Sequence, residues 1–527
     1  MSNSDGRPHM IVPRHQTRMV PALAMLLMTL TVPAWANGFP GGVRDALGPL
    51  FDAAPPHRTA PRPHSTHDGA EAMHRLQHWN EMAMNASGLD HTPVTPGEDR
   101  IFGEQYGPTR ASRAMAIVHI AIFDAVNAIA GGYQSYTGLP PAPADTSMDA
   151  AIAQAAHDTL VALYPSQWAS FDAQLADDLS QVRGQYGRAQ AKGIRLGQRA
   201  AKAILALRAK DGSDHAEPRV GIEFITGDEP GQWRQDPISQ LPLALGAHWG
   251  GVAPFVLRSA DQFRVPPPPA LRSREYAAAF TEVKRLGGDG IVTPTERTAE
   301  QTEIGIYWAY DGTPSLCAPP RLYNQIAMHI ADQQGTHVVE RARLLALVHM
   351  AMADAAIAIW ESKYAYEFWR PVTGIREADP GTGPTGAGDS NPATVGDPTF
   401  TPLGAPASNL TGPNFTPPFP AYPSGHAGFG GALFQILRHF YQTDDIAFTF
   451  VSDEFNGVTL DNDGNVRPLI PRRFSSLSQA EDENGQSRIY LGIHWAFDKT
   501  EGIAQGRRVA DYAFKHAFRP IPHTTPR

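Results

Sequence analysis

Three short polar blocks near the C-terminus limit what this chain can fold into more than any other feature. The first block is Lys-x6-Arg-Pro, the second is Pro-Ser-Gly-His, and the third is Ser-Arg-x5-His-x3-Asp. Their central residues are Lys363, Arg370, Ser424, His426, Arg488, His494 and Asp498. Three cations, two histidines, a hydroxyl and a carboxylate are suitable groups for binding a tetrahedral oxyanion. We therefore expect a fold that brings the three blocks together around one pocket.

Apolar residues recur at helical spacing through most of the chain, which favours an all-α fold. The clearest runs are 114–125, 148–163 and a long one, 339–369, which ends before Pro371. The spacing also predicts helices over 168–182, 189–207, 273–286, 296–310, 322–333, 425–441, 477–495 and 499–518. Two short strands, 447–451 and 458–469, are expected around an Asp-Asn-Asp-Gly turn, where a hairpin is favoured over a calcium loop.

Composition divides the chain into five segments. A basic flank, a short apolar run and a small-x-small site predict a secretory signal peptide over 1–36. Residues 37–68 are rich in Pro, Gly and Ala and are expected to be a disordered lead-in. An N-terminal helical bundle is expected over 69–210, a surface connection over 211–270, and a C-terminal helical domain over 271–520. The signal peptide predicts a secreted or periplasmic protein.

Net charge, apolar segment length and cysteine content exclude several kinds of partner and structure. A formal net charge of -9 with 18% charged residues gives no reason to expect binding to nucleic acid. No segment after the signal peptide is expected to reach the length of a membrane span, so none is expected in the mature chain. The one cysteine, Cys317, excludes a disulfide within the chain and lacks metal-binding spacing, so we expect a buried or half-buried thiol.

The first two blocks place donors where an anion can reach them. Lys363 and Arg370 are seven residues apart on a predicted helix, so both are expected on one face, two turns apart. Bulky apolar neighbours argue against a solvated basic stripe. Ser424 is expected to cap the next helix, and the N–H of Gly425 would point outward at its positive end. Alone, this second block is a weak signal because a Ser-Gly helix start is common.

The third block adds Arg488 and a paired histidine. His494 and Asp498 are four residues apart, so the carboxylate can accept the imidazole N–H. Such a bond selects the tautomer and makes the other ring nitrogen more basic, as a metal ligand or a nucleophile requires. A lone His-x3-Asp pair is most often structural, but the two preceding blocks favour a functional pair here.

In this order the three blocks resemble the signature of the superfamily that joins type 2 phosphatidic acid phosphatases and vanadium-dependent haloperoxidases. The longer forms Phe-Pro-Ala-Tyr-Pro-Ser-Gly-His (419–426) and Glu-Phe-Trp-Arg-Pro (367–371) are similar to those of the haloperoxidases, as are 310–312 and 321–325. The wide gap between the second and third blocks separates the chain from the phosphatase branch. The resemblance implies an all-α fold of two helical bundles with long connecting loops, and an oxyanion site in the C-terminal haloperoxidase- and phosphatase-like domain.

The same resemblance implies vanadate as the cofactor and a role for each site residue. The residues that would hold the vanadate oxygens are Lys363, Arg370, Ser424, Gly425 and Arg488. His494, supported by Asp498, would be the single protein ligand of vanadium. His426 would be the acid–base residue, and Lys363 would polarise the bound peroxide. Asp311 would pair with Arg488.

Two aromatic residues are expected to form an apolar wall beside this site. Trp360 lies three residues before Lys363 and shares its helical face, and Phe419 lies seven residues before His426. This pair is similar to that of the chloroperoxidase branch, whereas bromoperoxidases carry His in place of the Phe. The resemblance therefore favours oxidation of chloride as well as bromide, because an apolar wall leaves halide poorly hydrated.

Three functions remain open at this point. The favoured one is a haloperoxidase that oxidises halide with hydrogen peroxide to hypohalous acid, compatible with a small organic acceptor and with phosphate as a competitor of vanadate. The second is a secreted acid phosphatase that hydrolyses phosphomonoesters through a phosphohistidine at His494, with His426 protonating the leaving alcohol. The third, a non-catalytic oxyanion-binding protein, is disfavoured because binding alone would not need His426.

Overall fold

The computed structural model describes residues 66–181 and 187–521. The signal peptide predicted over 1–36 lies outside the described residues, and so does the predicted lead-in as far as residue 65. The mostly helical character expected from the sequence is confirmed. The helices are α2 (Thr66–Asp90), α3 (Gly107–Ala130), α4 (Met148–Leu163), α5 (Trp168–Gln181), α6 (Gly187–Arg208), α7 (Arg274–Leu286), α8 (Ala299–Tyr307), α9 (Pro320–Gln333), α10 (Val338–Tyr366), α11 (Pro371–Arg376), α12 (Gly425–Tyr441), α13 (Leu477–Tyr490) and α14 (Ala496–His516).

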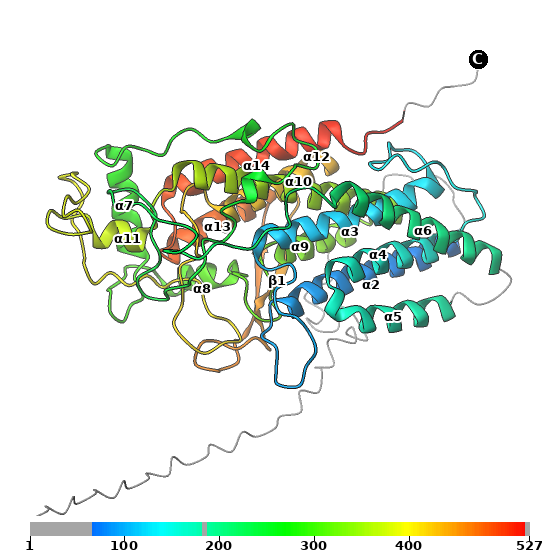
Figure 1. Cartoon of the computed structure of the whole chain (residues 1–527), viewed down its shortest axis with the longest axis horizontal. Coiled ribbons are helices and arrows are strands. Elements are labelled where there is room, and N and C mark those ends of the chain that lie inside the picture. The colour runs from blue at the N-terminus through cyan, green and yellow to red at the C-terminus, as the bar shows by residue number, and fades with distance from the viewer. Residues whose placement is uncertain (1–65, 182–186, 522–527) are drawn as a thin grey trace, which may run out of the picture. The chain divides into compact units, whose positions relative to one another are not determined.

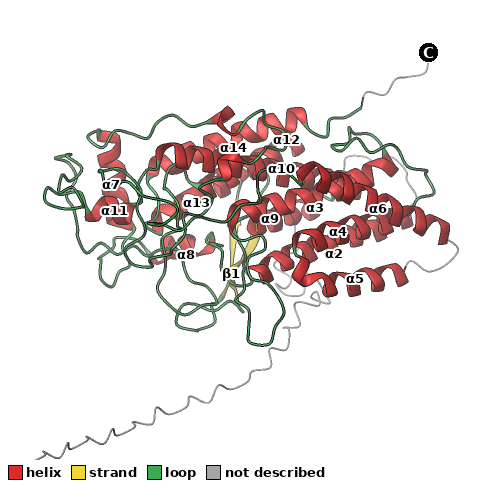
Figure 2. Ribbon diagram, viewed as in Figure 1, coloured by secondary structure: helices red, strands yellow, loops and turns green. Residues whose placement is uncertain are grey.

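The helices of the first half of the chain gather around α4. Figure 1 shows α2 to α6 on the right of the view and α7, α8, α11 and α13 on the left, and Figure 2 shows most of the long loops on the left. Helix α3 packs against both α4 and α10, so both halves of the chain share one apolar core. A Cβ on Gly197 would lie 2.7 Å from the carbonyl oxygen of Ala151, which shows how closely α6 approaches α4. The domain boundaries near residues 210 and 270 stay predictions.

Helix α10 runs through this core and carries Lys363 near its end. Both α3 and α10 are long and apolar enough to cross a membrane, which corrects the expectation that no segment after the N-terminus reaches that length. In α10 the whole of the most apolar window is buried inside the protein, and in α3 83% of it is. Packing against other helices therefore accounts for their composition.

The strands β1 (Phe448–Asn456) and β2 (Leu469–Phe474) form a two-stranded antiparallel sheet. The second strand, predicted over 458–469, is misplaced, because most of that stretch is a loop closed by a bridge between Leu460 and Val466. The Asp-Asn-Asp-Gly turn closes this small loop, and the strand that pairs with β1 follows it. Val458 and Val466 are 47% and 59% exposed, so their apolar character did not indicate a packed strand.

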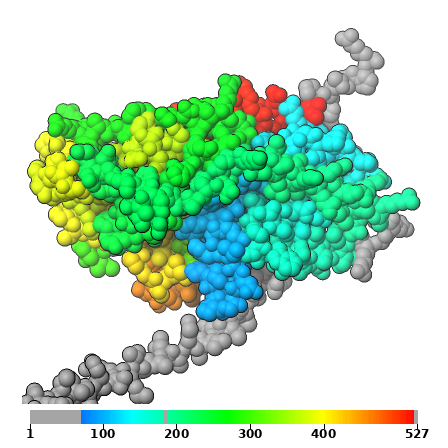
Figure 3. Space-filling view, in the orientation of Figure 1, coloured from blue at the N-terminus to red at the C-terminus, as the bar shows by residue number. Residues whose placement is uncertain are grey.

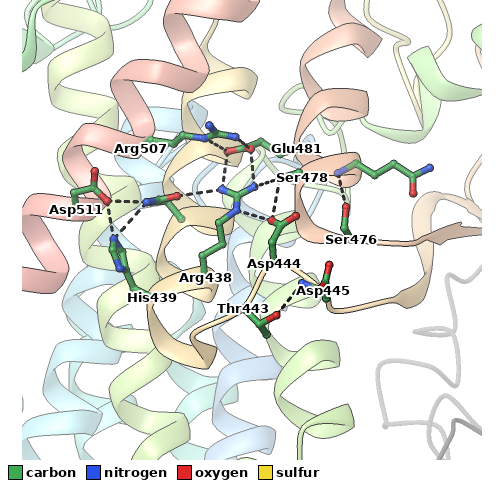
Figure 4. A network of polar contacts seen from close by, with 12 residues as sticks. Arg438, His439, Thr443, Asp444, Asp445, Ser476, Ser478, Glu481, Arg507 and Asp511 are labelled. Atoms are coloured by element: carbon green, nitrogen blue, oxygen red, sulfur yellow. Dashed lines mark hydrogen bonds and ion pairs between the residues drawn. The ribbon is translucent and has the colours of Figure 1, made fainter.

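A polar network joins α12, α13 and α14 (Figure 4). The carboxylate of Glu481 in α13 accepts from Arg438 of α12 at 2.8 Å and from Arg507 of α14 at 3.0 Å. Its side chain is 1% exposed, and removing one partner of such a buried ion pair is strongly destabilising. The network therefore holds the helix that carries Arg488 against the helix that carries His426.

The segment 211–270, predicted as a surface connection, is only partly at the surface. In the space-filling view the green residues, which include this segment, cover much of the face shown (Figure 3). Leu245 is buried, and its carbonyl oxygen accepts hydrogen bonds from Trp360 and Tyr364 of α10 at 3.0 Å each. Gly246 has φ +78°, and a Cβ there would overlap the indole of Trp360. The burial comes from a contact with a distant helix, which composition cannot show.

Candidate active site

Helix α10 ends between Lys363 and Arg370, against expectation. It stops at Tyr366, and Glu367 adopts a left-handed backbone with φ 45°. Arg370 has an extended backbone, with φ −79° and ψ 155°, and directly precedes α11. The following proline disfavours helical geometry at this position. The prediction that the two cations lie two turns apart on one helix is therefore wrong.

Lys363 and Arg370 nevertheless meet, at the loop that leads into the second block. Lys363 is fully buried, and its Nζ donates to the carbonyl oxygens of Pro420 and Ala421 at 2.7 and 2.9 Å. The Nε of Arg370 donates to the carbonyl oxygen of Phe419 at 2.9 Å. Both cations are thus held by the backbone of one loop.

Helix α12 begins at the second block, as predicted. Ser424 is the N-cap, and its Oγ accepts from the N–H of Ala427 at 3.4 Å. A Cβ added to Gly425 would lie 3.3 Å from the ring of Trp360, so a larger residue would press against the indole. The free N–H groups and partial positive charge of a helix N-terminus add anion-binding capacity beside the cations.

His426 lies in the first turn of α12, next to the turn that follows α8. Its Nε2–H donates to the carbonyl oxygen of Ala309 at 2.5 Å. Asp311 accepts two hydrogen bonds from Arg488 at 2.7 and 2.8 Å, so the expected contact between these residues is present. The same carboxylate lies 3.9 Å from Nε2 of His426. One short turn therefore contacts both the histidine and the arginine.

His494 lies in the loop between α13 and α14, not in the helix predicted over 477–495, and Asp498 lies in the first turn of α14. The expected bond is present, with Nδ1 of His494 2.7 Å from Oδ2 of Asp498. Since the carboxylate accepts, Nδ1 carries the proton and Nε2 keeps its lone pair. That lone pair accepts from Nη1 of Arg370 at 3.0 Å.

Burial controls the ionisation of these groups. Burial and the surrounding cations lower the pKa of Lys363, His426 and His494 well below their ordinary values. Burial raises the pKa of Asp498 to about 7. Burial is the main cause of each shift, and the surrounding cations add to it for Lys363 and the histidines but oppose it for Asp498. An anion bound among the cations would offset the cost of charge for the positive groups.

Three guanidinium nitrogens in this site have no hydrogen-bond partner among residues 66–181 and 187–521. They are Nη2 of Arg370 and both Nε and Nη1 of Arg488. Buried donors are rarely left without an acceptor because the desolvation cost is large. Such a set of unpaired donors is suited to an anion with several acceptor atoms.

A cavity of about 290 Å³ opens beside these groups. The rings of Trp360 and Phe419 lie on its wall with centroids 4.9 Å apart, as the predicted aromatic pair requires. The Nζ of Lys363 lies 5.1 Å from the centre of the Phe419 ring. The polar residues at the cavity include Asp311, His426, Arg488 and His494.

Sequence analysis missed several groups that shape this cavity. Ala309 acts through its carbonyl oxygen, so its side chain carries no signal. Leu245 and Leu410 line the cavity from loops far apart in the chain, and a leucine in a loop has no distinguishing pattern. The informative signals in the sequence were the spacing of charged and polar residues and the two aromatic residues beside them.

Comparisons with known proteins agree with this geometry. The family described as VCPO second helical-bundle domain matches residues 343–522. The vanadium chloroperoxidase of Curvularia inaequalis is 31% identical over 503 residues, covering 80% of this chain and 78% of that protein. A bacterial vanadium-dependent iodoperoxidase structure has a TM-score of 0.65 at 23% identity, covering 89% of this chain and 100% of its own. An apo-type bacterial vanadium-dependent chloroperoxidase has a TM-score of 0.58 at 16% identity, covering 78% and 94%. This chain therefore belongs to the vanadium-dependent haloperoxidase family.

Proposed function

We propose that this protein is a vanadate-dependent haloperoxidase that oxidises halide with hydrogen peroxide to hypohalous acid. In this proposal the oxyanion site belongs to the C-terminal one of two helical bundles. The observation that carries the proposal is the set of unpaired donors on Arg370 and Arg488 beside a neutral His494 whose Nε2 keeps its lone pair. The N-terminal segment supports the further proposal that the protein is secreted or periplasmic.

The residues present fit vanadate. The unpaired guanidinium N–H groups match an anion with several oxygens, and the cations Lys363, Arg370 and Arg488 match its negative charge. The lone pair on Nε2 of His494 is a suitable metal ligand, because Asp498 holds the other ring nitrogen. Residues that would hold the oxygens are Lys363, Arg370, Ser424, Gly425 and Arg488.

When bound, vanadate supplies a Lewis-acid centre that activates hydrogen peroxide toward halide. The side chains of the protein bind and orient the reactants and transfer protons. Neutral His426 holds a proton at Nε2 and exchanges it with a reactant when its bond to Ala309 opens. Lys363 and the arginines, all buried, place positive charge where the oxygens of the anion would lie. The wall formed by Trp360 and Phe419 strips water from the halide.

Vanadate and phosphate are expected to compete for this site, because both are tetrahedral oxyanions. Calorimetric titration of phosphate-free protein with vanadate should give one site, and added phosphate should raise its apparent Kd in proportion to phosphate concentration. Simultaneous binding of both anions would rule out a shared pocket and with it the proposed cofactor site.

Asp498→Ala is expected to weaken vanadate binding by about 10- to 100-fold, because the carboxylate orients His494 and selects its tautomer. The measurement is the Kd for vanadate by calorimetry. Asp511→Ala is a matched control, since Asp511 also accepts from a histidine, His439, at 2.6 Å but on another part of α14. Unchanged affinity in the Asp498 variant would show that another group orients His494.

Phe419→His is expected to lower kcat/KM for chloride more than for bromide. Loss of the apolar ring admits water to the wall beside Lys363, and chloride is the harder halide to desolvate and oxidise. The comparison is made on vanadate-loaded protein at one pH. Equal losses for the two halides would show that Phe419 does not control halide choice.

A further inference from the structure

The turn between α8 and α9 positions two groups of the active site without lying in any of the three sequence blocks. Ala309 accepts from His426, and Asp311 accepts twice from Arg488. The residue between them, Tyr310, has a left-handed backbone with φ 46°. This region is sparsely populated by residues other than glycine, so neighbouring contacts must hold the turn in place.

The contact that holds the backbone of this turn comes from strand β1. The N–H of Tyr310 donates to Oε1 of Glu454 at 3.1 Å, and Glu454 is fully buried. The phenol of Tyr310 is anchored separately, donating to Gln325 at 3.0 Å and accepting from the N–H of Asp453 at 2.6 Å. Loss of the Glu454 carboxylate is therefore expected to free the backbone of the turn while the ring stays in place.

The other carboxylate oxygen of Glu454 ties this turn to the cavity wall. It accepts from the hydroxyl of Ser408 at 2.6 Å and from Nη1 of Arg467. Ser408 follows Ala407, which lines the cavity. Three donors from three segments thus converge on one buried carboxylate, and all three need an acceptor.

Each element that packs against Glu454 places a charged side chain near it. Arg467 lies in the β1–β2 loop, Asp311 in the turn after α8, and Asp453, paired with Arg321 of α9 at 2.8 Å, is its neighbour in β1. Burial raises the pKa of Glu454 to about 7, although Arg467 opposes the shift. The carboxyl group therefore changes charge near neutral pH.

We propose that Glu454 is a positioning residue of the haloperoxidase site, which as a carboxylate holds the turn 309–311 against His426 and Arg488 and, on gaining a proton, releases it. The effect of Glu454 on catalysis rests on the proposed function. A protonated carboxyl group offers fewer acceptor positions to three donors, and the backbone of Tyr310 is the contact under strain. A fall in pH therefore loosens the active site through Glu454, which does not itself line the cavity.

Hydrogen exchange on a peptide that contains Tyr310 tests the proposal in the protein as purified. After correction for intrinsic exchange, protection should fall by about tenfold as pH drops through about 7. Glu454→Gln should show the low protection at every pH, without a step. In vanadate-loaded protein the same variant should lower kcat for bromide at pH 8 by about tenfold. Burial also raises the pKa of Asp498 to about 7, so a change of activity with pH would not distinguish Asp498 from Glu454, whereas exchange at the Tyr310 amide does.

Asp124→Asn in α3 is the matched control, since the carboxylate of Asp124 is equally buried and also accepts from the backbone of a turn, from the N–H groups of Tyr136 at 2.9 Å and Thr137 at 2.8 Å, but lies in the first half of the chain. It should keep the pH step. Ser408→Ala is a milder variant that removes a donor to the charged form, so the step should move to higher pH by up to about one unit.

The role of Glu454 would be overturned if the pH step persists in Glu454→Gln, is missing from the wild-type protein, or is lost equally in Asp124→Asn. Lack of halide oxidation in the wild-type protein would instead overturn the proposed function, and the exchange result would still decide whether Glu454 holds the turn.

Discussion

Replacing His494 with alanine is expected to abolish halide oxidation and to weaken vanadate binding by at least about 100-fold. His494 is the one site residue whose ring nitrogen is prepared as a ligand, because Asp498 accepts from Nδ1 at 2.7 Å and leaves the lone pair on Nε2. Within the described part of the chain, the other histidine beside the unpaired guanidinium groups is His426. Its Nε2 carries a proton, which it donates to the carbonyl oxygen of Ala309.

The control for this variant is His439→Ala, because His439 is also paired with a carboxylate, Asp511, but lies at the far end of α12 (Figure 4). It should keep the wild-type vanadate affinity and activity. Vanadate affinity is measured by calorimetry and halide oxidation by the halogenation of a reporter. Normal vanadate affinity in the His494 variant would exclude this residue as the ligand.

His426→Ala is expected to lower kcat by about 100- to 10,000-fold, the usual range for loss of a general acid–base group. Vanadate affinity should change by less than about tenfold, because the cations and His494 remain in place. Burial and the neighbouring arginines lower the pKa of His426 well below its ordinary value, which favours the neutral ring near neutral pH. The pair of variants therefore separates binding, which depends on His494, from proton transfer, which depends on His426.

This separation is read from kcat, KM for peroxide and the vanadate Kd on the same preparations. A His426 variant that loses vanadate as completely as the His494 variant would show that His426 acts in binding. A variant with wild-type kcat would show that the proton is handled by another group.

Helices with clear caps and an uninterrupted apolar repeat could be predicted from the sequence. Helix α4 and helix α12 begin and end at the predicted residues, because the apolar repeat marks their length, and in the structure the side chains of Ser147 and Ser424 cap their N-termini. Predictions failed where tertiary contacts decide the backbone. Helix α10 ends before Arg370, and β2 forms after the loop that was predicted to be the strand.

The site could be predicted as far as its side chains carry unusual chemistry at regular spacing. Lys363, Arg370, Arg488 and His494 were found in this way, and the fold brings them together. The groups that orient them could not be found, because Ala309 acts through its backbone and Glu454 is one carboxylate among many in the sequence. Their importance follows only from burial and from contacts across distant segments.

Halide oxidation by phosphate-free protein, with and without added vanadate and in the presence of hydrogen peroxide, separates a haloperoxidase from a phosphatase. Hydrolysis of a phosphomonoester by the vanadate-free protein is followed in parallel. For a haloperoxidase, halogenation of the reporter is expected to require vanadate, peroxide and halide together and to be lost in His494→Ala. Phosphomonoester hydrolysis without any vanadate-dependent halogenation would contradict the proposed function and would assign the same pocket to a phosphatase.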